Sequence, residues 1–475
     1  MTRSIIRVTL IMAVLLVAVL INITYIQVFK ADDYRTAAGN SRAILEEYSR
    51  ERGPILVGRE QVAKSVETGG ELRYERDYPQ GPMYAPATGF YSQVYGATGI
   101  EKAENPVLSG TDDRLLFDRL RQLLTGQNPQ GGAVTLTLDG NAQSAAFSGL
   151  GGRNGAVAAL DPKTGAILAL ASSPSFDPNQ LSSHNSKQIT SYYNQLTSDP
   201  NQPLLNRPLV ATNPPGSTFK IVTTAAALQS GEFTPDSIVP CPASYRLPGT
   251  SVSIKNAGGE AYGNISLTEA LVVSCNTAFA WLANQLGDDA LRAQSEAFGF
   301  GTSFDVPMPA AAGRYPENPD AAQTAITGYG QGDVQATALN MAQATAAIGN
   351  GGLTMSPFLV KEISSPDLKV LDTTSPKAFN QAMSAANASA ETEMMVRVVQ
   401  SGTGTAAQIP GVQVAGKTGT AETTEGAANT TWFVSFAPAD DPTIAVAVVL
   451  EESGGGGGSQ AAPIARSVMQ AYLGQ

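Results

Sequence analysis

The feature that most constrains this chain is an uncharged apolar segment that runs from Val8 to Val28. As a helix this segment would rise about 31 Å, which is enough to cross the hydrocarbon core of a bilayer. The alternative is a cleaved signal peptide, whose apolar region is shorter, roughly 7–15 residues, and is followed by a small-residue cleavage site. Here Tyr25–Phe29, with an aromatic residue at each end, closes the segment instead. We therefore expect an uncleaved membrane anchor.

The charges on either side of this segment predict how the chain is oriented. Arg3 and Arg7 precede it, and Lys30-Ala-Asp-Asp33 follows it. Because positive charge is retained on the cytoplasmic side, the N-terminus is expected in the cytoplasm and the rest of the chain outside. The sequence thus predicts a single-pass protein of the cell membrane with an extracytoplasmic body.

Composition excludes several kinds of chemistry. The chain has 475 residues, room for two or three domains, and its net charge of −11 argues against nucleic acid as a partner. Its one histidine, His184, lies in a polar stretch that is typical of an exposed loop, so a Ser-His-Asp triad is disfavoured. With two cysteines, Cys241 and Cys275, a zinc site would need carboxylates in place of the usual ligands. We expect no metal and no cofactor, and a general base that is lysine or carboxylate.

The region from residue 31 to about 150 shows no catalytic pattern. Short strands are expected over 53–58, 62–66 and 134–138, loop or short strand over 78–99, and an amphipathic helix over 115–124. Asp139 is expected to cap a helix over 142–150. A spacer or interaction module is the expected role.

From Gly155 the sequence contains short apolar runs that are typical of strands. Pro and Gly in 161–165 join two apolar runs, 156–160 and 166–171, as a β-hairpin, and strands over 412–417, 432–436 and 444–450 are spaced as an antiparallel meander. The five glycines 454–458 lack the strand and helix of a phosphate-binding loop, so we interpret them as a flexible linker before a last helix.

The segment Pro214-Pro-Gly-Ser-Thr-Phe-Lys220 is followed by an unbroken apolar run, 221–228, long enough for a buried helix. Ser217 therefore lies at or near the start of that helix, and Lys220 lies one turn later on the same face. Taken alone, the motif favours a simpler interpretation, in which Ser217 is a helix cap and Lys220 is a solvated lysine.

Two further motifs change that interpretation. Ser274-Cys-Asn276 and Lys417-Thr-Gly419 follow in order, and the set suits a serine that attacks an acyl carbonyl without histidine. Lys220 can take the serine proton if burial and a nearby cation such as Lys417 lower its pKa. Lys417 can equally bind a substrate carboxylate.

The remaining positions have roles in the same chemistry. Ser274 can relay a proton to the leaving group, and Asn276 can hold a substrate amide. Gly419 lets a ligand approach the strand closely. The backbone N–H groups of Ser217 and Thr420 can form an oxyanion hole.

The three motifs together resemble the penicillin-binding proteins and serine β-lactamases. Gly330-Gln-Gly332, Ser401-Gly-Thr-Gly404 and the strand Trp432–Pro438 add to the likeness, which covers about residues 150–475. There is no room for a separate glycosyltransferase domain, so the chain resembles the monofunctional class B proteins, and most of all the penicillin-binding protein A type of actinobacteria.

The resemblance implies an α+β fold, a central antiparallel sheet flanked by helices plus an all-helical part. It divides the chain into an anchor (1–30), a small mixed non-catalytic pedestal (31–150) and a transpeptidase domain (151–475). It also implies a D,D-transpeptidase that crosslinks peptidoglycan stem peptides through an acyl-enzyme on Ser217.

Residue roles follow from the same resemblance. Lys220 would be the base, Ser274 and Asn276 would line one wall, and Lys417, Thr418 and Thr420 would bind the carboxylate. β-Lactams would acylate Ser217, and a polytopic membrane glycan polymerase would be the partner.

Several alternatives remain open at this point. A β-lactamase needs a deacylating glutamate that the sequence between Ser274 and Lys417 does not show, and a D,D-carboxypeptidase differs only in its acceptor. A β-lactam sensor would need a cytoplasmic domain, and a decayed scaffold would not keep all three motifs. Cys241 and Cys275 can form a disulfide or remain two buried thiols.

Overall fold

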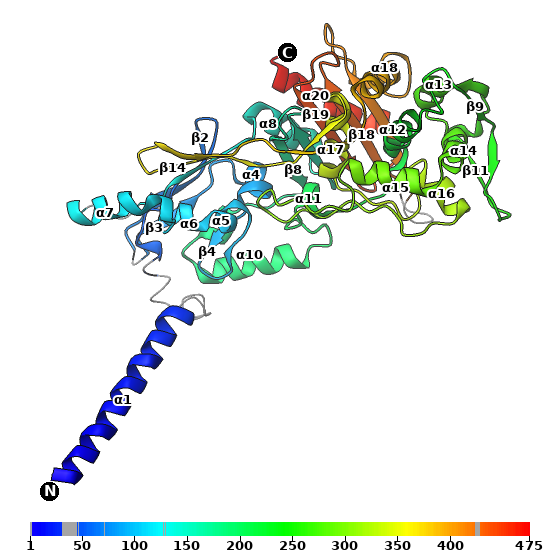
Figure 1. Ribbon diagram of the computed structural model, residues 1–475. Coiled ribbons are helices and arrows are strands. Elements are labelled where there is room, and N and C mark those ends of the chain that lie inside the picture. Colours follow the sequence, from blue (N-terminus) through cyan, green and yellow to red (C-terminus); the bar gives the residue numbers. More distant parts are fainter. Residues whose placement is uncertain are drawn as a thin grey trace.

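The computed structural model describes residues 2–30, 45, 47–70, 72–126, 128, 130–422 and 428–475. A single helix, α1 (Thr2–Phe29), projects from an elongated body whose two ends are built by different parts of the chain (Figure 1). Ile5–Val28 of α1 is apolar and exposed, and it is the one helix of the described residues that is long and apolar enough to cross a membrane. The predicted apolar helix is therefore present as a candidate membrane span.

The larger end of the body is built on a five-stranded antiparallel sheet in the order β17-β18-β19-β7-β8. Its strands are β7 (Gly155–Leu160), β8 (Ile167–Ser173), β17 (Ala415–Ala421), β18 (Thr430–Ala437) and β19 (Ile444–Leu450). The predicted hairpin and meander are thus confirmed. Every residue of β18 and β19 is buried, because helices cover both faces of the sheet.

Each face of this sheet packs against its own set of helices. On one face, α8 (Gly140–Leu150) and α20 (Ala462–Leu473) share an apolar cluster with the alternate residues of β7 and β19. On the other lie α17 (Ala338–Gly349) and α18 (Ala385–Ser401). Asp139 caps α8 as expected, since its Oδ1 accepts the N–H of Ala142 at 2.8 Å.

A helical part lies beside the β17 edge of the sheet. Its central helix, α12 (Lys220–Ser230), is buried from Lys220 to Leu228, which confirms the predicted buried helix. Around it lie α13 (Leu267–Val272), α14 (Asn276–Leu286), α15 (Asp288–Ala297) and α16 (Ala321–Thr327), with two small ribbons, β9 (Ile238–Cys241) with β12 (Gly263–Ser266) and β10 (Ser244–Arg246) with β11 (Ser253–Lys255). Residues 273–275 separate α13 from α14.

The pedestal end is built on a six-stranded sheet in the order β15-β14-β6-β1-β2-β3. Four of its strands come from the first part of the chain: β1 (Ile55–Val57), β2 (Glu60–Glu67), β3 (Tyr74–Asp77) and β6 (Ala133–Leu136). The hairpin β14 (Val360–Ser364) and β15 (Val370–Thr373) comes from far downstream and pairs with β6. The pedestal sheet is therefore not continuous in sequence. The expected boundary at residue 150 separates β14 and β15 from the other four strands of this sheet.

Short elements complete the body. Helices α5 (Gly99–Ala103), α6 (Asn105–Leu108) and α7 (Leu116–Thr125) belong to the pedestal, with the bridge of β4 (Tyr91–Ser92) and β5 (Gly96–Ala97). Helices α9 (Asn179–Ser182), α10 (Ser186–Ser198) and α11 (Arg207–Val210) follow β8 in the chain, and β13 (Leu353–Met355) pairs with β16 (Ala378–Gln381).

Two local expectations were wrong. Residues expected as loop or short strand include a helix, α4 (Gly81–Thr88), which is possible because Pro82 lies in the first turn, where no backbone N–H is needed. His184 is not a free loop residue, because its side chain is half-buried against the pedestal, with Nε2 3.1 Å from the Tyr74 carbonyl and Nδ1 3.7 Å from Glu75.

A buried ionic cluster holds the pedestal together. Glu101 on α5 accepts one hydrogen bond from Arg52 and one from Arg76, each at 2.6 Å, and all three side chains are buried. Burial opposes the ionised carboxylate, but the two guanidinium groups hold the pKa of Glu101 below its usual range. Removing the Glu101 carboxylate would leave two buried guanidinium groups without a counter-charge.

Candidate active site

Ser217 and Lys220 lie where the chain turns into α12. Ser217 is in a short 3-10 turn (Gly216–Phe219), and Lys220 is the first residue of α12. The expected geometry is present, since Lys220 Nζ lies 3.1 Å from Ser217 Oγ. The preceding prolines are held in place because the Trp432 indole on β18 donates to the Pro214 carbonyl at 2.9 Å.

Glycine allows the turn to approach its neighbours closely. Gly216 has a φ of +53°, and a Cβ atom there would lie 2.6 Å from the carbonyl oxygen of Thr420 on β17. On its other side, Gly216 N–H donates at 2.8 Å to the carbonyl of Gly330, which lies in the glycine-dense loop 328–332. Only backbone without a side chain fits at this contact.

The second motif lies between α13 and α14 and faces the first. Ser274 has a φ of +58°, which is uncommon for a residue with a side chain. In this conformation its carbonyl oxygen lies 2.6 Å and its Oγ 3.1 Å from Lys220 Nζ, and Asn276 Oδ1 lies 2.8 Å from the same nitrogen. The serine-cysteine-asparagine motif therefore surrounds the Lys220 amine.

The third motif lies on β17, the edge strand of the central sheet. Lys417 Nζ donates to Ser274 Oγ at 2.9 Å and to the carbonyl of Thr418 at 3.0 Å. The Ser274 hydroxyl thus bridges the two lysines, which are 197 positions apart in the sequence. Thr418, Gly419 and Thr420 line the adjoining cleft, so the structure brings all of the predicted site residues together.

Burial lowers the pKa of both lysines. Lys220 and Lys417 are each 0 % exposed. Burial, and then the charge of Lys417, hold the pKa of Lys220 well below its usual range. Burial lowers the pKa of Lys417 to about 7.

The partners of Lys220 suit an uncharged amine. Its two shortest contacts, at 2.6 and 2.8 Å, are to carbonyl oxygens of Ser274 and Asn276, which can only accept. A neutral amine has two N–H donors for these oxygens, so its one lone pair remains to accept a hydroxyl proton from either Ser217 or Ser274, whose Oγ atoms both lie at 3.1 Å. This is the arrangement that a general base for Ser217 requires.

The three motifs open into one cleft of about 1330 Å³. Tyr329 and Gln331 of the glycine-dense loop line it from the helical side, and Gly456, Gly457 and Gly458 line it from the sheet side. The interpretation of the five glycines as a flexible linker was wrong. Gly457 begins a short helix, α19 (Gly457–Gln460), and a Cβ there would lie 2.1 Å from the Trp432 carbonyl and 2.5 Å from that of Gly419.

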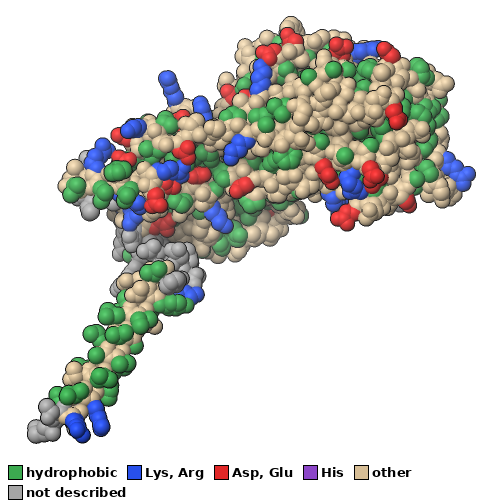
Figure 2. All heavy atoms as spheres, viewed as in Figure 1, with side chains coloured by type: hydrophobic (Ala, Val, Ile, Leu, Met, Phe, Trp, Pro, Cys, Tyr) green, Lys and Arg blue, Asp and Glu red, His purple; other side chains and the backbone are tan. Residues whose placement is uncertain are grey.

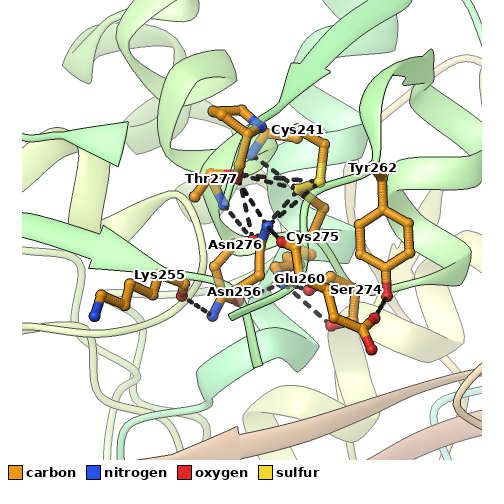
Figure 3. The surroundings of a disulfide bond; sticks show 12 residues. Cys241, Lys255, Asn256, Glu260, Tyr262, Ser274, Cys275, Asn276 and Thr277 are labelled. Carbon is orange, nitrogen blue, oxygen red and sulfur yellow. Dashed lines mark hydrogen bonds between the residues drawn. A yellow bond between two sulfur atoms is a disulfide. The ribbon is translucent and has the colours of Figure 1, made fainter. Parts of the chain in front are cut away.

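Cys241 and Cys275 are joined by a disulfide, which resolves the alternative that the sequence left open (Figure 3). Cys241 ends β9, and Cys275 caps α14, its Sγ accepting the N–H of Ala278 at 3.3 Å. Asn256 supports the same loop, since its Oδ1 accepts the N–H of Thr277 at 3.1 Å and its Nδ2 donates to Pro242 and Glu260 carbonyls. Covalent and polar contacts therefore hold the strained loop of Ser274.

One contributor was not assigned a role from the sequence. Thr403, in the Ser-Gly-Thr-Gly segment after α18, lines the cleft, and its Oγ1 lies 2.6 Å from Thr418 Oγ1. The segment was noted only for its likeness to the family, and no spacing rule connects it to Thr418. The contact depends on α18 packing against β17.

Comparison with protein families agrees with this site. Residues 155–470 match the model of the penicillin binding protein transpeptidase domain, and residues 52–134 match that of the penicillin binding protein A dimerisation domain. The peptidoglycan D,D-transpeptidase PbpA of Mycolicibacterium smegmatis is 43% identical, over 100% of this chain and 99% of that protein. PbpA of Mycobacterium tuberculosis is 42% identical over the same shares.

Solved structures are similar as well. Penicillin-binding protein A from M. tuberculosis, as a ceftriaxone acyl-enzyme complex, matches with a TM-score of 0.88 and 42% identity, over 90% of this chain and 100% of that chain. The D,D-transpeptidase domain of a peptidoglycan glycosyltransferase from Eggerthella lenta matches with a TM-score of 0.80 and 34% identity, over 90% and 99%.

Proposed function

Since the chain belongs to the penicillin-binding protein transpeptidase family, we propose that Ser217 is its acylated nucleophile and Lys220 the base that activates it. The protein is a serine peptidoglycan D,D-transpeptidase of cell-wall synthesis, and β-lactams acylate it as substrate mimics. The observation that carries the residue assignment is the Ser274 hydroxyl, which bridges the amines of Lys220 and Lys417 at 3.1 and 2.9 Å.

Acylation begins at the penultimate D-Ala of a donor stem peptide. Lys220 takes the proton of Ser217 Oγ as that oxygen attacks the D-Ala carbonyl carbon. The backbone N–H groups of Ser217 and Thr420 stabilise the oxyanion of the tetrahedral intermediate. The C–N bond to the terminal D-Ala then breaks, and the proton returns to the leaving amine from Lys220 by way of Ser274.

The donor is held by its terminal carboxylate and its amide. Lys417, with the hydroxyls of Thr418 and Thr420, binds the carboxylate, which favours the protonated form of Lys417. Asn276 holds an amide group of the peptide. This division of roles uses one buried lysine as a neutral base and the other as a cation.

Transfer to the acceptor completes the crosslink. The free D-Ala leaves, and the amine of a second stem peptide attacks the ester carbonyl while Lys220 removes a proton from it. Breaking the ester bond returns the proton to Ser217 Oγ and leaves a new amide bond. The cleft of about 1330 Å³ has room for both peptide ends.

We also propose roles for the rest of the chain. Residues 1–30 anchor the protein by α1, with Arg3 and Arg7 on the cytoplasmic side and the transpeptidase domain (151–475) outside. Residues 31–150 are a non-catalytic pedestal, completed by the β14–β15 hairpin. A polytopic glycan polymerase in the same membrane supplies the strands that are crosslinked.

The assignment is tested by labelling the full-length protein with a fluorescent penicillin. Wild type and Ser253→Ala, which removes another hydroxyl from the same cleft, are expected to label. Ser217→Ala is expected not to label. Equal labelling of Ser217→Ala and wild type would overturn the choice of nucleophile.

A second assay separates transpeptidase from D,D-carboxypeptidase. The purified protein is given a donor stem peptide with and without a D-amino-acid acceptor, and the products are identified by mass spectrometry. Exchange of the terminal D-Ala for the acceptor is expected to exceed hydrolysis. Release to water alone would assign a carboxypeptidase.

A further inference from the structure

Helix α7 of the pedestal exposes an apolar face that nothing in the described part of the chain covers. Phe117 is 83% and Leu124 85% exposed, and Leu116 and Leu120 are about half exposed, whereas Leu115 just before the helix is buried. Phe117, Leu120 and Leu124 are three and four positions apart, so they form one stripe along the helix. Apart from α1, no other described element exposes so many large apolar side chains.

The position of α7 links it to the membrane anchor. Gln122 on α7 accepts the backbone N–H of Gln130 at 3.4 Å, and Gln130 Nε2 donates to the Glu51 carboxylate at 2.8 Å. Glu51 forms an isolated bridge with Gln130 four residues before β1 begins. Figure 1 accordingly has α1 and α7 at the same end of the molecule, away from α12 and β18 of the catalytic part.

The flanks of the apolar stripe are polar and carry arginines. Arg121 is 58% exposed and Arg119 33%, with their nearest carboxylates 3.7–4.0 Å away. Figure 2 shows hydrophobic side chains at this tip with both basic and acidic side chains around them. An apolar stripe of Phe and Leu bordered by arginines is typical of a helix that lies in the interface of a bilayer.

We propose that α7 is a second membrane attachment, lying in the lipid interface beside α1 with Phe117, Leu120 and Leu124 among the acyl chains. Arg119 and Arg121 then lie at the level of the lipid phosphates. The proposal rests on the proposed anchoring by α1, which keeps the pedestal next to the bilayer. Two attachments in place of one restrict the tilt of the pedestal and hence the height of the active-site cleft above the membrane.

A lipid surface suits this face better than a second copy of the chain. A stable protein interface buries about 800 Å² per partner, and one stripe of three side chains on a ten-residue helix offers much less. Residues 52–134 match a family model that is described as a dimerisation domain, so contact between two copies is the rival outcome.

The full-length protein in vesicles of phosphatidylcholine and phosphatidylglycerol tests the proposal. Because both native cysteines are in the disulfide, Phe117→Cys and Leu124→Cys can each be labelled at one site with an environment-sensitive fluorophore. Ala293→Cys, exposed on α15 of the catalytic part, is the matched control. Quenching by lipids with a nitroxide in the acyl chain is expected to be several-fold stronger at positions 117 and 124 than at 293.

Three outcomes are distinguishable. Quenching at 117 and 124 no stronger than at 293 overturns the proposal. Disulfide crosslinking of unlabelled Phe117→Cys between two copies, without lipid quenching, assigns the face to a dimer and also overturns it. Flotation with the vesicles reads out anchoring by α1, and labelling with fluorescent penicillin reads out the catalytic site, so failure of either is recognised separately.

Discussion

Loss of the Cys241–Cys275 cross-link is expected to destabilise the catalytic part and to slow its acylation. The bond joins residues 34 positions apart, and the segment between them includes β10, β11, β12 and α13. Closing a loop of that length stabilises the folded state by about 4 kcal/mol in the chain-entropy model. Because Cys275 lies between Ser274 and Asn276, a loosened segment also moves the groups that surround the Lys220 amine.

Two measurements on the full-length protein check this prediction. Thermal unfolding and the rate constant of acylation by a fluorescent penicillin are recorded with and without a phosphine reductant, with thiol counting to verify reduction. Reduction of wild type is expected to lower the Tm by roughly 8 °C, since about 2 °C corresponds to 1 kcal/mol for a large domain. Cys241→Ala is expected to show the same loss without reductant and no further change with it.

The control is Val239→Ala, which removes a buried side chain from the same strand but keeps the bond. Its unfolding must respond to reductant as wild type does. If two free thiols are counted in reduced wild type while its Tm and acylation rate constant are unchanged, the hydrogen bonds of Asn256 alone hold the loop, and the reasoning is refuted.

Three further perturbations have expected outcomes. The acylation rate constant should rise with pH as Lys220 loses its proton, and it should fall above about pH 7 as Lys417 loses the charge that binds the carboxylate. The Lys417→Arg variant should lack the fall at high pH. If stopped-flow acylation gives this variant the same pH profile as wild type, these roles are contradicted. Gly457→Ala should slow acylation at least tenfold, because its Cβ would meet the β17 and β18 backbone, whereas Gly456→Ala, whose Cβ meets nothing closer than 4.0 Å, should acylate normally. Glu391 on α18 is buried with both carboxylate oxygens unpaired, and burial raises its pKa well above the usual range. As pH rises above about 4.5, this carboxyl ionises in the unfolded chain before it does in the folded chain, so the free energy of unfolding falls. Glu391→Met should raise the free energy of unfolding at pH 7 by about 1–3 kcal/mol, with a gain that shrinks on acidification in denaturant titrations; a gain independent of pH would show that Glu391 is not neutral when folded.

Much of the fold was predictable because it depends on local pattern. The period-two and continuous apolar runs of 156–171 and 432–450 predicted the hairpin and meander of the central sheet, and the unbroken run after Lys220 predicted α12. The exposed stripe of α7 has the same periodicity as a buried helix face, so its spacing predicted the helix but not what covers it.

The proposed catalytic residues were predictable for a chemical reason. With one histidine in the chain, the base for a serine nucleophile had to be sought among lysines and carboxylates, and Lys220 lies one turn from Ser217. The motifs of Ser274 and Lys417 completed a known pattern. Residue identity and order therefore determined the reaction class, the proposed nucleophile and the proposed base.

Only the tertiary structure decided how those groups act on one another. The bridge through the Ser274 hydroxyl, the burial that lowers both lysine pKa values, and the contact of Thr403 with Thr418 join segments far apart in the chain. The glycines 454–458 were taken for a linker because their composition is that of one, yet Gly457 packs against β17 and β18, where a Cβ would not fit. A run of glycines predicts a flexible segment from composition alone, whereas the close approach of two backbone segments exists only after the chain has folded.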